Sequence, residues 1–139
     1  MAADNGFSLN MEAVKALAAD LNRIRGRLQP AMKKVTSKGA LNVKTAAKQS
    51  ILDQTQHLFV KQYPNAITYT ITQSTGMFVE AEIGPDKDKP QGALGNILEY
   101  GTSLNPPYPH LGPSLDAEAD SYEQYLGDAV RDAIFGEEE

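Results

Sequence analysis

The feature that most constrains the fold is an alternation of apolar and polar residues on both sides of Gly76. Before this glycine, Ile67, Tyr69 and Ile71 alternate with threonines. After it, apolar residues again occupy every second position: Met77, Val79, Ala81 and Ile83. This pattern predicts a β-hairpin with one buried and one solvated face. Because two strands alone are marginally stable, the hairpin must pack on helices or join strands of a neighbouring subunit.

The segment near the N-terminus has the spacing of an amphipathic helix. Its apolar residues recur three or four positions apart: Val14, Leu17, Leu21, Ile24, Leu28, Met32 and Val35. One narrow stripe of this kind predicts a helix with a single apolar face, and Ser8 or Asn10 is suited to cap its start. Since Pro30 supplies no amide hydrogen and clashes with the preceding turn, we expect a kink or a break near Gln29.

A second helix is expected before the hairpin. Residues 37–39 (Ser-Lys-Gly) are typical of a turn. A helix from about Leu41 to Gln62 follows, and Pro64 is expected to end it. Its apolar side consists of Val43, Ala47, Ile51, Leu58 and Phe59.

Glycines and prolines divide the next part of the chain. Residues 84–95 are polar and rich in Gly and Pro, which predicts a loop without structure of its own, of a kind that is often functional or mobile. Residues 96–100 predict one or two helical turns that Gly101 stops. The prolines of residues 103–113 predict a stiff, extended connector.

A last helix completes the chain. Proline suits a first helical turn, so we expect this helix to begin at about Pro113 or Ser114. Acidic residues follow where the helix dipole favours them, at Asp116, Glu118 and Asp120. Its apolar side consists of Leu115, Ala119, Tyr122, Leu126, Ala129 and Ala133. The elements together predict an α+β fold, in which long N-terminal helices and a C-terminal helix pack on a small antiparallel β-sheet formed by the hairpin.

The length of the chain suits one domain. With 139 residues it can bury an ordinary core without disulfides or metals. We expect residues 1–139 to form a single domain with flexible ends at residues 1–8 and 136–139. The absence of cysteine excludes disulfides, thiolate metal sites and cysteine nucleophiles. The N-terminus lacks the pattern of a signal peptide. No apolar run approaches the roughly 20 residues that span a bilayer, so no membrane partner is expected.

The charges are unevenly distributed. Residues 1–64 hold ten Lys and Arg against four Asp and Glu, a net charge of +6, whereas residues 65–139 hold three against fourteen, a net charge of −11. The simplest interpretation is that both halves present solvated faces. A second interpretation is self-association, in which the basic face of one copy meets the acidic face of the next, because complementary faces of this kind close into rings.

Few residues offer catalytic chemistry. His57 and His110 have no partner at metal-binding spacing, so we expect each in a surface or half-buried structural role and expect no metal or cofactor. Glu99, Tyr100 and His110 could in principle support proton transfer, but nothing in their spacing requires it. The simpler interpretation is that Glu99 bonds to the backbone in the turn of residues 101–103. We therefore expect no enzymatic activity.

Residues 92–115 carry the most distinctive motif of the chain. Residues 98–102 read Leu-Glu-Tyr-Gly-Thr, a proline-rich loop follows, and residues 109–115 read Pro-His-Leu-Gly-Pro-Ser-Leu before an acidic helix. This resembles the neck or minor tail (tail completion) family of long-tailed bacteriophages, especially versions from phages of actinobacteria. The match is specific over about a quarter of the chain. Residues 63–67 (Tyr-Pro-Asn-Ala-Ile) depart from the Thr-Gly-containing segment of many members, which fits a diverged subgroup.

The resemblance implies a structural subunit of the head-to-tail connector, or neck, that joins the DNA-filled capsid to the tail. It implies a homo-oligomeric ring, commonly a hexamer, with a head-closure protein on one side and a tail terminator or tail tube protein on the other. The protein would be made in the host bacterial cytoplasm and end in the virion. The residues expected to serve assembly are Glu99, Tyr100, Gly101, Thr102, Tyr108 and Leu111. We expect Gly101 to adopt a backbone conformation closed to other residues.

Two alternatives stay open. In the first alternative the protein is still a phage structural protein but acts as a tail terminator, which caps the tail tube and stops its growth. A small DNA-binding protein would use the basic residues of the first half, and the ring itself could make non-specific contact with DNA in its channel. The sequence has no helix-turn-helix pattern, no aromatic stacking platform and a net charge of −5, so solvated helix faces explain the basic residues better.

Overall fold

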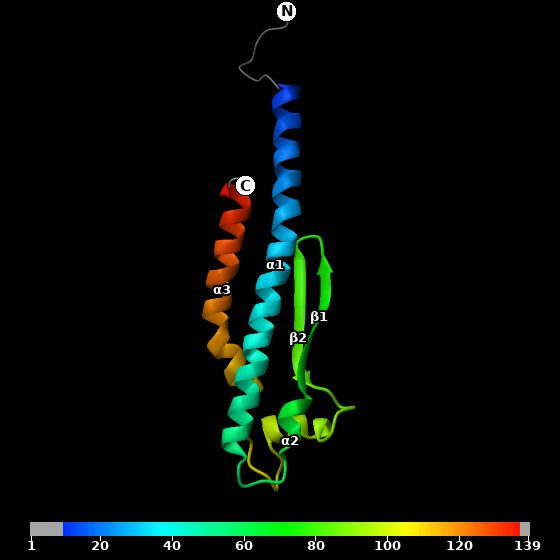
Figure 1. The fold of residues 1–139 in the computed structure, drawn as a ribbon, viewed down its shortest axis with the longest axis vertical. Coiled ribbons are helices and arrows are strands. Elements are labelled where there is room, and N and C mark those ends of the chain that lie inside the picture. Colours follow the sequence, from blue (N-terminus) through cyan, green and yellow to red (C-terminus); the bar gives the residue numbers. More distant parts are fainter. Residues whose placement is uncertain (1–9, 137–139) are drawn as a thin grey trace, which may run out of the picture.

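The computed structural model describes residues 10–136, and it has the predicted α+β fold (Figure 1). A long helix α1, Met11–Gln54, leads through a short 3-10 turn, Tyr63–Ala66, into the antiparallel strands β1, Ile67–Thr75, and β2, Phe78–Pro85. A second 3-10 turn, Gly92–Leu94, precedes the short helix α2, Gly95–Tyr100, and the chain ends with α3, Leu111–Phe135. The flexible ends predicted at residues 1–8 and 136–139 lie outside the described residues, except for Gly136.

One helix replaces the two that the sequence predicted near the N-terminus. Asn10 caps it as expected, since its side chain accepts hydrogen bonds from the amides of Glu12 and Ala13. The predicted break is wrong, because α1 continues through Pro30 and only changes direction gently along its length (Figure 1). Packing against α3 and the hairpin offsets the cost of the hydrogen bond that the exposed proline removes.

The turn predicted at residues 37–39 is also wrong. Gly39 lies inside α1, directly beneath the ring of Tyr122 on α3, and a Cβ atom there would stand 3.0 Å from the tyrosine Cδ2. Thr36, one turn earlier, shares a 3.0 Å hydrogen bond with the Tyr122 hydroxyl. The glycine therefore serves the close approach of two helices, and its presence in the sequence does not mark a chain reversal.

Helix α1 ends earlier than predicted. It stops at Gln54, whereas the sequence pattern extended it to Gln62, and the Thr55 amide makes the last helical bond to the Ile51 carbonyl. Leu58 and Phe59 were assigned to the apolar side of that helix, yet Phe59 is 95% exposed. The early end lets the chain turn back so that Tyr63 and the following residues enter the core beside Ile51.

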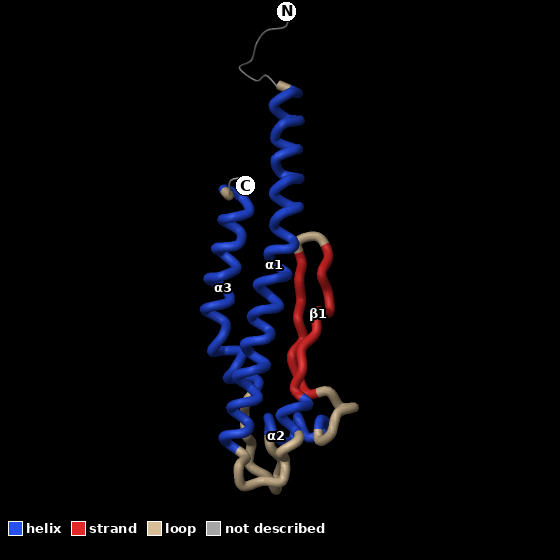
Figure 2. The backbone as a smooth tube through the Cα atoms, in the orientation of Figure 1, coloured by secondary structure: helices blue, strands red, loops and turns tan. Residues whose placement is uncertain are grey.

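The hairpin confirms the alternation in the sequence. Strands β1 and β2 pair from Ile67 opposite Pro85 to Thr75 opposite Phe78, with one irregularity between Ile71 and Gln73. Val79, Ala81 and Ile83 are partly buried, while the residues between them are exposed. Both strands run beside α1, and α3 lies on another side of the same helix (Figure 2).

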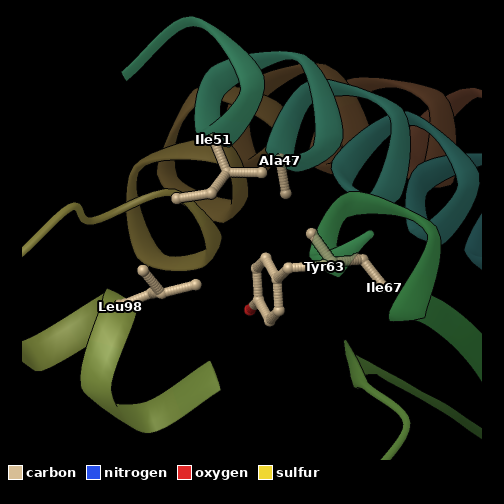
Figure 3. Close-up of a cluster of buried hydrophobic side chains, with 5 residues drawn as sticks. All are labelled: Ala47, Ile51, Tyr63, Ile67 and Leu98. Atoms are coloured by element: carbon tan, nitrogen blue, oxygen red, sulfur yellow. The ribbon is translucent and has the colours of Figure 1, made fainter. Parts of the chain in front are cut away.

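The buried core lies at the end of the molecule where α1 stops. Its members come from four elements, namely α1, the first 3-10 turn, β1 and α2, and they surround the ring of Tyr63 (Figure 3): Ala47, Ile51, Tyr63, Ile67 and Leu98. Tyr63, Ile51 and Ile67 are fully buried. The core joins α1, the start of the hairpin and α2, and it fixes the position of the distinctive motif, which begins within α2 at Leu98.

Candidate functional site

The motif of residues 98–115 folds into a joint between α2 and α3. Glu99, near the end of α2, is 8% exposed, and its carboxylate faces the first turn of α3. One oxygen accepts hydrogen bonds from the amides of His110, at 2.8 Å, and Leu111, at 2.9 Å. The other accepts from the amide of Gly112 at 2.9 Å. One side chain thus satisfies three of the amides that a helix start leaves without partners.

This geometry corrects two predictions. Glu99 does not bond within the turn of residues 101–103, and α3 begins at Leu111, before the predicted start at Pro113 or Ser114. The residue at the N-cap position, His110, makes no side-chain capping bond to α3, so an acceptor from elsewhere is needed. A buried carboxylate at this position also faces the positive end of the helix dipole.

His110 is fully buried, which contradicts the expected surface or half-buried position. Its Nε2 lies 2.8 Å from the hydroxyl of Tyr63, and its Nδ1 lies 2.8 Å from the carbonyl oxygen of Tyr108. The same Nδ1 is 3.0 Å from the Glu99 carboxylate. The imidazole can enter the core because every polar atom of its ring has a partner there.

Burial and hydrogen bonding act in opposite directions on Glu99. Burial by itself would raise the pKa of this carboxyl, but the amides of Leu111, Gly112 and His110, together with the imidazole of His110, lower the pKa below its usual value. Burial, assisted by the negative charge of Glu99, raises the pKa of Tyr63 to about 12. Near neutral pH the cluster therefore holds a carboxylate and a neutral phenol, and hydrogen bonds join both groups to the protein.

Gly101 ends α2 in the conformation that the sequence predicted. Its φ of 72° and ψ of −177° belong to a region that glycine alone occupies readily. A Cβ atom would stand 2.8 Å from the Pro107 nitrogen and 2.9 Å from the Asn105 carbonyl oxygen. The predicted special conformation of Gly101 is confirmed, and it lets the loop fold back over the end of α2.

Thr102 closes that loop. Its amide donates to the carbonyl of Asn105 at 2.9 Å. Its hydroxyl oxygen accepts hydrogen bonds from the amides of Leu104 and Asn105, at 3.2 Å and 3.1 Å. Residues 102–105 therefore form a tight turn that presents Leu104, which is 90% exposed. The proline connector begins with this turn and is extended only after it.

The remaining predicted residues divide between the core and the surface. The amide of Tyr108 donates to the Leu98 carbonyl at 2.6 Å, and its hydroxyl lies 3.3 Å from Nε2 of exposed His57. Tyr108 and Leu111 pack on the core. Tyr100 is 78% exposed. Five of the six predicted assembly residues therefore build one joint, and Tyr100 lies outside it on the surface.

Sequence reasoning missed two residues that organise this end of the molecule. Tyr63 provides the buried hydroxyl beside His110. Gln91 adopts a left-handed conformation, and its side chain bonds to the carbonyl of Phe59 and the amides of Gln62 and Tyr63. Residues 84–95 are thus tied to the core and are not the structureless loop that was predicted. The structural role of Gln91 could not be predicted from the sequence, because its neighbours in sequence do not distinguish it from an exposed glutamine.

The cluster has the chemistry of a structural joint. Among the described residues, no buried side-chain polar atom lacks a hydrogen-bond partner, and no group of acidic residues and histidines has the arrangement of a metal site. Within residues 10–136, no helix combines the length and the apolar character needed to cross a membrane.

Searches for similar proteins found no matching family model, no matching curated protein and no matching solved structure. A functional assignment for this chain therefore rests on the geometry of residues 10–136 and on the resemblance carried by the motif.

Proposed function

We propose that this protein is a structural subunit of the head-to-tail connector ring of a tailed bacteriophage, without catalytic activity or a cofactor. The observation that carries the proposal is the joint between α2 and α3. The motif that resembles the neck family supplies the capping carboxylate Glu99, the left-handed Gly101 and the turn at Thr102. Five of the six motif residues expected to serve assembly contribute to one local structure, and Tyr100 lies beside it on the surface. A chance match of composition would not place the five residues together.

The distribution of charge supports assembly into a ring. Helix α1 carries most of the basic residues of the first half, and burial together with the charges of Lys44 and Lys89 lowers the pKa of Lys48. Helix α3 carries six acidic residues and one basic residue: Asp116, Glu118, Asp120, Glu123, Asp128, Asp132 and Arg131. Helix α1 is thus mainly basic and α3 mainly acidic, and surfaces of opposite sign on neighbouring copies attract each other.

In this proposal the ring lies in the virion, between a head-closure protein and the tail. The role of the protein is tested best in phage particles, because the free protein need not assemble into a ring. The test is electron microscopy of lysates from a phage in which this gene is disrupted. Filled heads beside separate tails of normal length are the expected result. Tails of uneven or excessive length would assign the protein to tail termination, and joined particles would refute both positions.

A complementation series links that test to the joint. Wild-type protein supplied in trans should restore joined particles, and so should Gln124→Ala, which changes an exposed, uncharged side chain of α3. Gly101→Val should not restore them, because the valine side chain would collide with the backbone at Asn105 and Pro107. Recovery of infectious particles with Gly101→Val would contradict the proposed role of the motif.

The DNA-binding alternative has its own test. Lys44 and Lys89 both lie close enough to Lys48 for their charges to act on it, and a group of like charges of this kind attracts phosphates. Fluorescence anisotropy with a labelled duplex would show binding that weakens steeply with salt if these residues serve DNA. For a connector subunit we expect weak binding at low salt and none near physiological salt.

A further inference from the structure

The first turns of α1 carry an apolar stripe that no other part of residues 10–136 covers. Val14, Leu17 and Leu21 are 39%, 59% and 57% exposed. At 100° per residue they lie on the same side of α1 as Leu28, which is buried. Helix α3 ends at Phe135, and Arg27 reaches the carbonyl of Gly136 at 3.0 Å. The N-terminal turns of α1 therefore extend past the end of α3 (Figure 1).

The same two helices leave an apolar groove between them. Its volume is about 730 Å³, and its walls come from the middle of α1 and the second half of α3. Small and aromatic side chains form most of its surface: Ala31, Val35, Gly39, Tyr122, Tyr125, Ala129 and Ala133. Lys34 and Lys38 lie along the α1 wall, and Asp128 and Asp132 lie along the α3 wall.

We propose that the stripe of one subunit, Val14, Leu17 and Leu21, docks into this groove on a second copy of the chain. Residues 11–24 would then form the third helix of a small bundle with α1 and α3 of the neighbour. A subunit cannot fill its own groove in this way, because stripe and groove wall belong to one continuous helix, Met11–Gln54. The occupant is therefore another molecule.

The charges beside the stripe match those of the groove. At 100° per residue, Asp20, whose exposed carboxylate also pairs with Arg23 at 2.7 Å, falls on one side of the stripe and Arg25 on the other. In one orientation Asp20 approaches the lysine wall of the groove, and Arg25 approaches the wall of Asp128 and Asp132. Rim charges of this kind select the direction of docking and add little affinity, so the apolar stripe supplies most of the binding.

Stripe against groove is a heterologous contact, in which each subunit gives one surface and receives a different one. Contacts of this type form a ring when the rotation between successive copies closes, whereas stripe against stripe closes at two copies and leaves the groove empty. The biological setting of this inference rests on the proposed connector ring. The contact itself can be measured on the purified protein, so the two proposals can fail separately.

Cross-linking of single-cysteine variants tests the contact, because the natural chain contains no cysteine. Leu17→Cys places a thiol on the stripe, and Ala129→Cys places one in the groove. Each variant is incubated with a short bis-maleimide, alone and as an equimolar mixture, at increasing protein concentration. The expected result is a covalent dimer that forms mainly in the mixture and contains one copy of each variant.

Two outcomes overturn the proposal. A dimer from Leu17→Cys alone, equal in yield to that of the mixture, would mean that stripes pack on each other. No cross-linked product from any sample at millimolar concentration would mean that the two surfaces do not meet. A mixed dimer combined with intact particles after gene disruption would preserve the contact and remove only its assignment to the neck.

Sedimentation velocity gives a second measurement that does not depend on cysteine. Leu17→Glu should weaken self-association at least about tenfold, since a charge replaces an apolar anchor at the centre of the stripe. Ala129→Glu, in the groove, should weaken it to a similar extent. Leu104→Glu is the matched control, because Leu104 is 90% exposed and belongs to neither surface. Equal association by all three variants would contradict the proposal.

Discussion

The two ends of α1 differ in almost every physical respect. Its C-terminal end carries Ala47 and Ile51 into a buried core, beside a joint in which the Glu99 carboxylate accepts three amide hydrogen bonds. Its N-terminal end exposes Leu17 and Leu21 to solvent although their spacing is that of a packed helix. The comparison teaches that the apolar side chains at the C-terminal end are covered by the same chain. Those at the N-terminal end have the pattern of a surface that a partner molecule covers.

The largest effect is expected at the joint. Glu99→Ala removes the acceptor for three amides at the start of α3 and should lower the free energy of unfolding by about 3–5 kcal/mol, because buried donors lose their partners. Urea denaturation followed by circular dichroism measures this loss. Glu123→Ala, on the exposed side of α3, should change the same quantity by less than about 0.5 kcal/mol. Similar losses in both variants would mean that Glu99 does not hold the joint.

The next effect concerns two glycines of opposite behaviour. Gly101→Ala places an alanine at a backbone φ of 72°, which residues with a Cβ atom rarely adopt, and brings the added Cβ against the backbone of Pro107. We therefore expect the free energy of unfolding to fall by about 2–3 kcal/mol. Gly127→Ala lies in α3 with nothing within 4 Å of the added Cβ, so we expect a gain of about 0.5–1 kcal/mol. Thermal melts of the two variants should shift in opposite directions. A loss at both positions would mean that the exposed helix tolerates a side chain no better than the turn does.

Acid should weaken the joint selectively. The pKa of Glu99 is lower in the folded protein than its unfolded value near 4.5, so its contribution to stability is fully present above pH 4.5. That contribution declines as the pH falls through the folded pKa. Urea midpoints measured between pH 7 and pH 3 should therefore fall in the acid range. In Glu99→Gln this part of the decline should be absent, and an unchanged pH profile would show that other carboxyls cause it.

The smallest effect is expected at the exposed end of α1. Leu17→Ala should change the unfolding free energy of dilute, monomeric protein by less than about 0.5 kcal/mol, since the side chain is 59% exposed. Ile51→Ala, at the buried end of the same helix, should cost about 2–5 kcal/mol. Both values come from urea denaturation at low concentration. A large loss for Leu17→Ala in the monomer would mean that its own subunit already packs on the stripe.

The hairpin, the Asn10 cap and the conformation of Gly101 could be predicted because each depends on neighbours in sequence. Alternation with period two defines the face of a strand. The side-chain oxygen of Asn10 accepts hydrogen bonds from amides two or three residues away at the start of a helix. Gly101, which has no Cβ atom, adopts the backbone conformation that ends a helix. The same local reasoning failed at Gly39, where a turn was predicted. In the sequence, a glycine that marks a turn looks the same as a glycine that allows two helices to pack closely.

The candidate site was found only as a set of residue types. The motif pointed to Glu99, Gly101, Tyr108 and Leu111, but the partners of Glu99 lie 11 to 13 positions away in the chain. Likewise, the burial of His110 depends on Tyr63, which is 47 positions distant. No periodicity or spacing connects such residues, because their contact exists only after α2 and α3 have been brought together by the core.

The sequence by itself determined the α+β composition of this protein, the hairpin and the apolar stripe of the first helix, since these follow from periodicity within single elements. Only the tertiary structure decided that α1 is unbroken at Pro30, that Glu99 caps α3 and that Leu17 and Leu21 stay exposed. The physical reason is that hydrogen-bond satisfaction and burial depend on which groups meet in space. These contacts are fixed by packing between elements that are far apart in the chain.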